Sequence, residues 1–85
     1  MTSSIEEIKE NVKTYILTEF LPGESPEALT DDTELVTHGV LDSLSTLQLV
    51  TYIEKEYSIT VQAHEVSTDN INRLPDIANL VTSKL

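Results

Sequence analysis

The sequence contains no cysteine, which excludes disulfides, thiolate metal sites and a thiol nucleophile of the chain's own. Glycine is also scarce, with 2 residues in 85, so no glycine-rich loop is available to cradle a phosphate. Basic residues number 5 against 15 acidic ones, and the net charge is −10. Nucleic acids and anionic membrane surfaces are bound by basic faces, so the composition excludes both as partners.

Long hydrophobic runs are absent as well. No apolar run is long enough to span a membrane, and residues 1–10 lack the apolar stretch of a signal peptide. These absences predict a soluble cytoplasmic protein. The length predicts a single domain over residues 1–85, with one modest core and no deep catalytic cleft.

Three segments carry apolar residues at the spacing of one helical face. The first is residues 4–20, where a serine and a glutamate three positions apart form the pattern of a capping box. The second is residues 43–57, with Asp42 or Ser43 as its N-cap. The third starts near residue 72 and continues to the last residue. The predicted apolar stripe of the second segment consists of Leu41, Leu44, Leu47, Leu49, Val50, Ile53 and Tyr57.

The connections differ in length and composition. Residues 21–39 are interrupted by proline and glycine and form a long loop, in which we expect a short helical turn. Residues 58–61 are an extended link, and residues 67–72 hold a single helical turn. The sequence therefore predicts an all-α fold, a small bundle of three main helices plus one short helix, with a long loop between helices 1 and 2. The expected anchors of the long loop are Leu29, Leu35 and Val36.

Catalytic groups are few. His38 and His64 are the only histidines, and neither has an acidic residue at the spacing of a helical metal motif. The acidic residues are scattered or adjacent, as on solvated faces. We therefore expect no metal site and no catalysis by the chain itself. If the chain were a hydrolase, Ser43 would have to be the nucleophile and His38 its base. No third member of such a triad is evident in the sequence.

One constellation remains, the run Gly-Val-Leu-Asp-Ser-Leu at residues 39–44. It closes the long loop and opens the second helix. Ser43 lies where backbone N–H groups and the helix dipole favour an anion, so the position suits a phosphate ester. The alternative is that Asp42 and Ser43 are only a helix cap, as in an acidic helical interaction module that is never modified.

This run resembles the attachment motif of the acyl and peptidyl carrier proteins, in which Asp-Ser-Leu starts the second helix of a small acidic bundle. The first helix, the long loop ending at Gly39, the second helix and the last helix match that family in order. The resemblance implies that Ser43 carries covalently attached 4′-phosphopantetheine, whose thiol holds acyl or aminoacyl intermediates as thioesters. Asp42 would present the serine, and Leu44 and Leu47 would contact partner proteins.

The resemblance also implies a set of partners. A phosphopantetheinyl transferase would bring magnesium and coenzyme A, and the Ser43 hydroxyl would attack the β-phosphate and release adenosine 3′,5′-bisphosphate. An acyl- or aminoacyl-loading ligase (an adenylation enzyme) and downstream synthase or tailoring enzymes would then act on the cargo. The chain itself would be a non-catalytic monomer.

The residues after Ser43 bear on the pathway. Fatty-acid carriers usually show acids there, whereas Ser45, Thr46, Gln48 and Thr51 are neutral. The run is more similar to free-standing carriers of specialised metabolism, which predicts a discrete carrier in a nonribosomal peptide or polyketide-type pathway. A carrier of fatty-acid synthesis and a D-alanyl-type carrier are the alternatives within the family.

Overall fold

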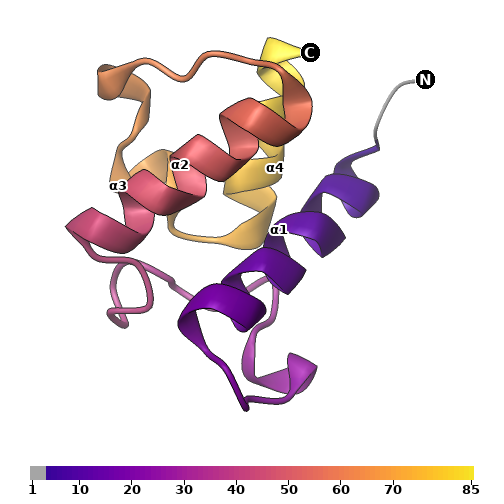
Figure 1. Cartoon of the computed structure of the whole chain (residues 1–85), viewed down its shortest axis with the longest axis vertical. Helices are drawn as coiled ribbons and strands as arrows, with labels where there is room; N and C mark the ends of the chain where they lie inside the picture. The colour runs from indigo at the N-terminus through magenta and orange to yellow at the C-terminus, as the bar shows by residue number, and fades with distance from the viewer. Residues whose placement is uncertain (1–3) are drawn as a thin grey trace.

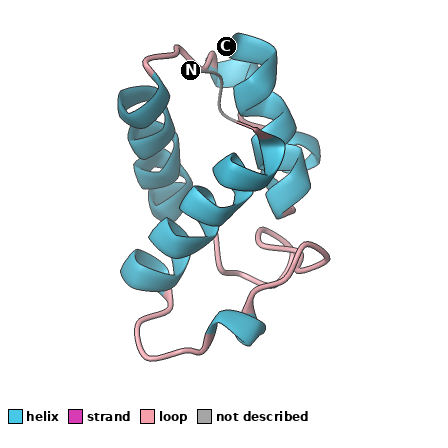
Figure 2. Ribbon diagram, turned by 90° about the vertical axis from the view of Figure 1, so that its right-hand side faces the viewer, coloured by secondary structure: helices cyan, strands magenta, loops and turns pink. Residues whose placement is uncertain are grey.

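The computed structural model describes residues 4–85 and is built from helices joined by loops (Figure 1). Three helices are long, namely α1 (Ile5–Phe20), α2 (Ser43–Tyr57) and α4 (Leu74–Lys84). The short helix α3 (Thr68–Ile71) and two 3₁₀ turns, η1 (Pro26–Ala28) and η2 (Ala63–Glu65), lie between them. No strand occurs in this part of the chain (Figure 2), so the predicted all-α bundle is confirmed.

Helix α1 begins where the sequence predicts and for the expected reason. The Ser4 side chain accepts a hydrogen bond from the backbone N–H of Glu7 at 3.1 Å, which satisfies one of the free N–H groups of the first turn. Ile8, Val12 and Ile16 are fully buried and form one face. This face packs mainly against α4 and, to a lesser extent, against α2.

Helix α2 has the predicted bounds, but its buried face differs from the predicted stripe. Leu49, Val50 and Ile53 are buried, whereas Leu44 and Leu47 are 65% and 63% exposed. The predicted apolar stripe is therefore wider than the buried face: Leu44, for which the sequence leaves the core and a contact surface open, lies on the solvent side together with Leu47. The helix is apolar on more than one side. The side that includes Leu49 is buried because residues of α1 and α4 pack against it.

The core lies between the three long helices. A second, smaller group of buried side chains joins Val50 of α2, Val61 of the following link and Leu80 of α4. Ile59 packs against this group, so the extended link after α2 contributes to the core through Ile59 and Val61, and Val66 joins them from further along the chain. The main buried cluster consists of Ile8, Val12, Ile16, Leu29, Leu35, Leu41, Leu49, Ile53, Ile71, Leu74, Ile77, Ala78 and Val81.

The long connection between α1 and α2 runs along the bottom of the view in Figure 1 and contains the expected short turn, η1. Two of its three predicted anchors, Leu29 and Leu35, are fully buried, and Val36 is half-buried. The last helix starts at Leu74 rather than near residue 72, because the chain is extended at Arg73. Leu85 is 55% exposed and lies outside the core.

The second turn, η2, was not predicted from the sequence. A capping box holds this turn: the Gln62 side chain accepts the Glu65 backbone N–H, and the Glu65 side chain accepts the Gln62 backbone N–H. No helix described in residues 4–85 has the length and hydrophobicity needed to cross a membrane.

Candidate functional site

Ser43 is the first residue of α2 and is exposed to solvent. Asp42 precedes it as the N-cap, and its carboxylate accepts a hydrogen bond from the Ser45 N–H at 2.8 Å. The Asp42 carbonyl accepts the Thr46 N–H at 2.8 Å and so begins the helical ladder. Of the two predicted caps, Asp42 makes the bond, and the Ser43 hydroxyl is left to face solvent.

The charge on Asp42 is stabilised by the helix that it caps. Hydrogen bonding from the Ser45 N–H is the main cause that holds the pKa of the Asp42 carboxyl below its usual value. The first turn of α2 contains no acidic residue of its own. Apart from the Asp42 carboxylate, no acidic side chain of α2 competes for the positive end of the helix dipole, where an anion bound through Ser43 would lie.

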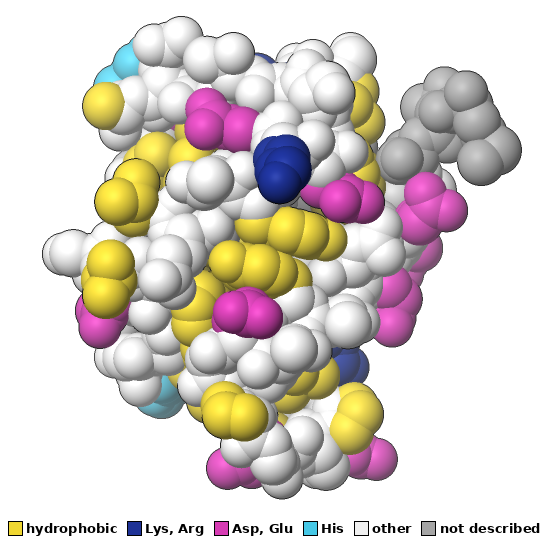
Figure 3. Space-filling model, in the orientation of Figure 1, with side chains coloured by type: hydrophobic (Ala, Val, Ile, Leu, Met, Phe, Trp, Pro, Cys, Tyr) yellow, Lys and Arg dark blue, Asp and Glu magenta, His cyan; other side chains and the backbone are white. Residues whose placement is uncertain are grey.

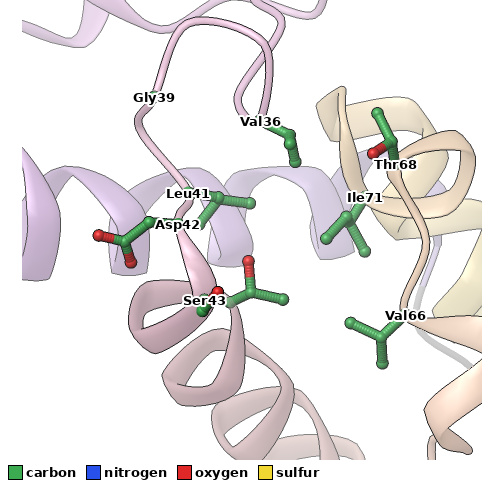
Figure 4. Close-up of a pocket in the computed structure, with 9 residues that line it drawn as sticks. Val36, Gly39, Leu41, Asp42, Ser43, Val66, Thr68 and Ile71 are labelled. Atoms are coloured by element: carbon green, nitrogen blue, oxygen red, sulfur yellow. The ribbon is translucent and has the colours of Figure 1, made fainter.

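A hollow of about 610 Å³ opens beside Ser43, between the end of the long loop and the segment around α3 (Figure 4). The side chains of Leu41 and Val36 project into it from one side, and those of Ile71 and Val66 face them from the other. The Asp42 carboxylate points away from the hollow. The complete lining is Val36, Gly39, Leu41, Asp42, Ser43, Thr46, Val66, Thr68 and Ile71.

A second hollow of about 590 Å³ also starts at Ser43 and runs along α2 toward Glu54. It lies between one face of that helix and the segment of residues 61–66, and its lining is mostly apolar. The Glu54 carboxylate accepts the Val61 N–H at 2.9 Å and fixes this segment to the helix. Ser43 therefore stands at the junction of two open hollows, with space for an attached group on either side.

Leu44 and Leu47 form an exposed apolar ridge next to Ser43. Leu47 borders the hollow toward Val61 and a further one, on the other side of the helix, that includes the stacked rings of Tyr15 and Tyr52. Adjacent exposed leucines are typical of a protein contact surface. Figure 3 shows apolar side chains reaching the surface on the side of α2, with acidic side chains more frequent toward the edge formed by α1.

The histidines lie apart from this arrangement. His38 is exposed and its Nε2 is 3.8 Å from a carboxylate oxygen of Glu34, and His64 is exposed on η2. The hydrogen bonds of residues 4–85 include none between His38 and Ser43. Within the same residues no group of three or more histidine and acidic side chains could hold a metal ion.

The sequence identified Asp42, Ser43, Leu44 and Leu47, and the structure brings these four together at one end of α2. The sequence analysis did not identify the opposite wall of the first hollow. That wall is formed by Val66, Thr68 and Ile71, which lie more than 20 residues after Ser43 in the chain. No local pattern indicates that these side chains approach Ser43, because only the packing of α3 against α4 places them there.

Comparisons with known proteins agree with this geometry. A family profile described as the phosphopantetheine attachment site matches residues 18–81, which include all of α2. A solved structure titled "Crystal structure of FAD-dependent dehydrogenase" contains a chain that is similar to this one, with a TM-score of 0.75 and 27% sequence identity. The alignment covers 82% of this chain and 97% of that chain, so the two are of similar length. A search of curated proteins found no match.

Proposed function

Because the chain belongs to the phosphopantetheine-attachment family of acyl and peptidyl carrier proteins, we propose that Ser43 is the residue to which 4′-phosphopantetheine is attached. The observation that carries the proposal is the exposed Ser43 hydroxyl at the first residue of α2, at the mouth of two hollows. The next hydroxyl along the chain, that of Ser45, belongs to a half-buried residue whose N–H is used by the Asp42 cap.

The residues around Ser43 fit the group chemically. A phosphodiester on the Ser43 oxygen lies at the positive end of α2, where backbone N–H groups and the helix dipole stabilise a negative charge. The hollows beside it are lined by aliphatic side chains and by the hydroxyl-bearing residues Thr46 and Thr68, which suit an arm with apolar and amide portions. When bound, the group supplies a thiol on which an acyl or aminoacyl cargo is held as a thioester.

In the attachment reaction this chain provides the nucleophile and its orientation. The Ser43 oxygen forms a bond to the β-phosphorus of coenzyme A, and the pyrophosphate bond breaks to release adenosine 3′,5′-bisphosphate. The hydroxyl proton leaves to a base of the transferase, since His38 makes no hydrogen bond to Ser43 in the described chain. Asp42 keeps the first turn of α2 intact while this happens.

The carrier has no catalytic machinery in this proposal and is acted on by separate enzymes as a monomer. Its partners are a phosphopantetheinyl transferase, an acyl- or aminoacyl-loading ligase and downstream synthase or tailoring enzymes. The exposed Leu44 and Leu47 form the contact surface, next to the neutral side chains Ser45 and Gln48. Apolar contacts between neutral groups make recognition depend on shape more than on charge.

The neutral surface supports a discrete carrier of a nonribosomal peptide or polyketide-type pathway over a carrier of fatty-acid synthesis. Complementary charges on two contact surfaces raise the association rate, and added salt lowers that rate again by screening the charges. Association through apolar surfaces has little dependence on salt. The two pathways are therefore distinguished by offering the modified protein to a ligase or transacylase of each type and measuring loading at low and high ionic strength. A D-alanyl-type carrier is recognised in the same assay by selective loading with D-alanine.

The attachment site is tested by intact-mass measurement after incubation with a broad-specificity phosphopantetheinyl transferase, magnesium and coenzyme A. We expect wild type to gain the mass of one phosphopantetheine and Ser43→Ala to gain none. Ser45→Ala is the matched control, since it removes a neighbouring hydroxyl on the same turn, and it is expected to be modified like wild type. A folded, previously unmodified wild type that gains no mass would support an acidic interaction module in which Asp42 and Ser43 serve only as a cap.

A further inference from the structure

Asn72 lies between α3 and α4 and is only 8% exposed, although its side chain is polar. It is the one buried polar residue of the chain from position 4 to position 85. A buried amide is costly unless its donor and acceptor are both paired. The partners of Asn72 therefore indicate what the residue holds in place.

The side chain and the backbone carbonyl of Asn72 bond to the end of the long loop before α2, while its own N–H donates to the Thr68 carbonyl. The Asn72 Oδ1 accepts the N–H groups of Val36 at 2.9 Å and Thr37 at 3.2 Å. Its Nδ2 donates to the Thr37 Oγ1 at 3.3 Å, and its backbone carbonyl accepts the Leu35 N–H at 2.6 Å. One residue thus makes four hydrogen bonds to three consecutive residues that lie about half the chain away.

The loop that Asn72 holds leads directly to Ser43. The Leu41 N–H donates to the Leu35 carbonyl at 3.0 Å, which closes residues 35–41 into a compact turn. Gly39 makes the turn possible, because its φ of +80° is strained for residues with a side chain. Leu41 is buried and is followed by Asp42 and Ser43, so the start of α2 is attached to a turn whose base is fixed by Asn72.

The same bonds connect the chain segments that form two walls of the first hollow. Val36 lines one wall, and Ile71, next to Asn72 in the chain, lines the opposite wall (Figure 4). A contact that holds Val36 to the α3 side therefore sets the separation of the two walls as well as the position of the turn. The connection from Asn72 to Ser43 is a continuous series of packed and hydrogen-bonded residues.

We propose that Asn72 is a positioning residue for the modification of Ser43. The inference rests on the proposed attachment at Ser43 and names a distant residue on which presentation of that hydroxyl depends. Without the Asn72 side chain, the Val36 and Thr37 N–H groups lose their acceptor, and the turn that carries Asp42 and Ser43 is tied to Asn72 only through the Leu35 N–H and the Asn72 backbone carbonyl. The hydroxyl is then misplaced relative to the reacting phosphate, although the contact surface of α2 is intact.

The test compares the kinetics of phosphopantetheinylation in full-length variants, with the modified fraction read by intact mass. Asn72→Ala removes all side-chain bonds to the loop, whereas Asn72→Asp keeps an oxygen that can accept the Val36 and Thr37 N–H groups. Val81→Ala is the control for stability, because Val81 is fully buried on α4 and its side chain makes no hydrogen bond to the loop. All rates are measured where circular dichroism shows each variant to be folded.

We expect Asn72→Ala to lower kcat roughly tenfold with a smaller change in KM, since a misplacement of about 1 Å can cost up to about a hundredfold. Asn72→Asp restores most of the rate, and Val81→Ala is modified like wild type. The amide resonances of Gly39, Asp42 and Ser43 shift in Asn72→Ala and not in Val81→Ala. A loss of stability alone would produce neither the kinetic difference nor this local set of shifts.

The proposal is overturned if folded Asn72→Ala is modified at the wild-type rate, or if Val81→Ala is slowed to the same extent. Should Asn72→Ala fail to fold, Asn72→Gln takes its place, because the longer side chain displaces the amide by one bond, and a wild-type rate in that variant overturns the proposal. Failure of the attachment site itself would look different, since wild type would then gain no mass or Ser43→Ala would gain it.

Discussion

Asp42 and Ser43 are adjacent in the chain and have different tasks at the residue scale. The Asp42 carboxylate is committed to the helix through the Ser45 N–H, and that bond is the main cause of its lowered pKa. The Ser43 side chain is exposed, which leaves its oxygen accessible to a transferase. The cap holds the first turn of α2 in one conformation, which under the proposed attachment keeps the Ser43 hydroxyl in place for the transferase.

The lowered pKa of Asp42 predicts how the stability of the chain depends on pH. A carboxyl whose pKa is lower in the folded state stabilises the fold above its unfolded pKa of about 3.9, and the contribution is lost as pH falls through the folded value. We expect the urea midpoint of wild type to exceed that of Asp42→Asn at neutral pH and the difference to shrink below about pH 4. A difference that stays constant from neutral to acid pH would show that the charge of Asp42 does not contribute.

At the scale of the element, α2 presents different apolar groups to the core and to solvent. Leu49 is fully buried among residues of α1 and α4, while Leu44 and Leu47 lie on the open side next to Ser43. Buried and exposed leucines on one helix have the same chemistry but different surroundings. Substitutions should therefore separate the energy of folding from the energy of partner binding.

We expect Leu49→Ala to lower the free energy of unfolding by about 2–5 kcal/mol, because it leaves a cavity in the core. Leu44→Ala and Leu47→Ala should change it by no more than about 0.5 kcal/mol and should instead raise the KM of the transferase or loading ligase. Urea unfolding and partner kinetics measured on the same samples check both statements. Unchanged partner kinetics in the Leu44→Ala, Leu47→Ala double variant would rule out this surface as the contact.

At the scale of the whole molecule, the fold is compact, but the extent of packing differs between its parts. The radius of gyration is 11.8 Å, close to the roughly 12 Å expected for a folded chain of this length. The most extensive packing joins α1 to α4, whereas residues 22–28 of the long loop are exposed. Regions with few buried contacts open more readily than the core.

Amide hydrogen exchange should show this uneven distribution. We expect slow exchange at Val12 and Ile77, which are buried in the α1–α4 core, and rapid exchange over residues 22–28. Val36, although it belongs to the same long loop, should exchange more slowly than that exposed part because its N–H is bonded to Asn72. Equal exchange at Val36 and over residues 22–28 would contradict the role given to Asn72.

The sequence by itself determined the class of fold, the bounds of α2 and the serine at its start, and it narrowed the N-cap to Asp42 or Ser43. These features depend on local spacing and on side chains that act within one turn, so a single segment contains the information. The sequence did not decide which leucines of α2 are buried, because that depends on which helices cover it. Nor did it indicate that Asn72 holds the loop before Ser43 or that Ile71 faces Val36 across a hollow. Those contacts join residues more than 30 positions apart, and only the packing of α3 and α4 against the rest of the chain brings them together.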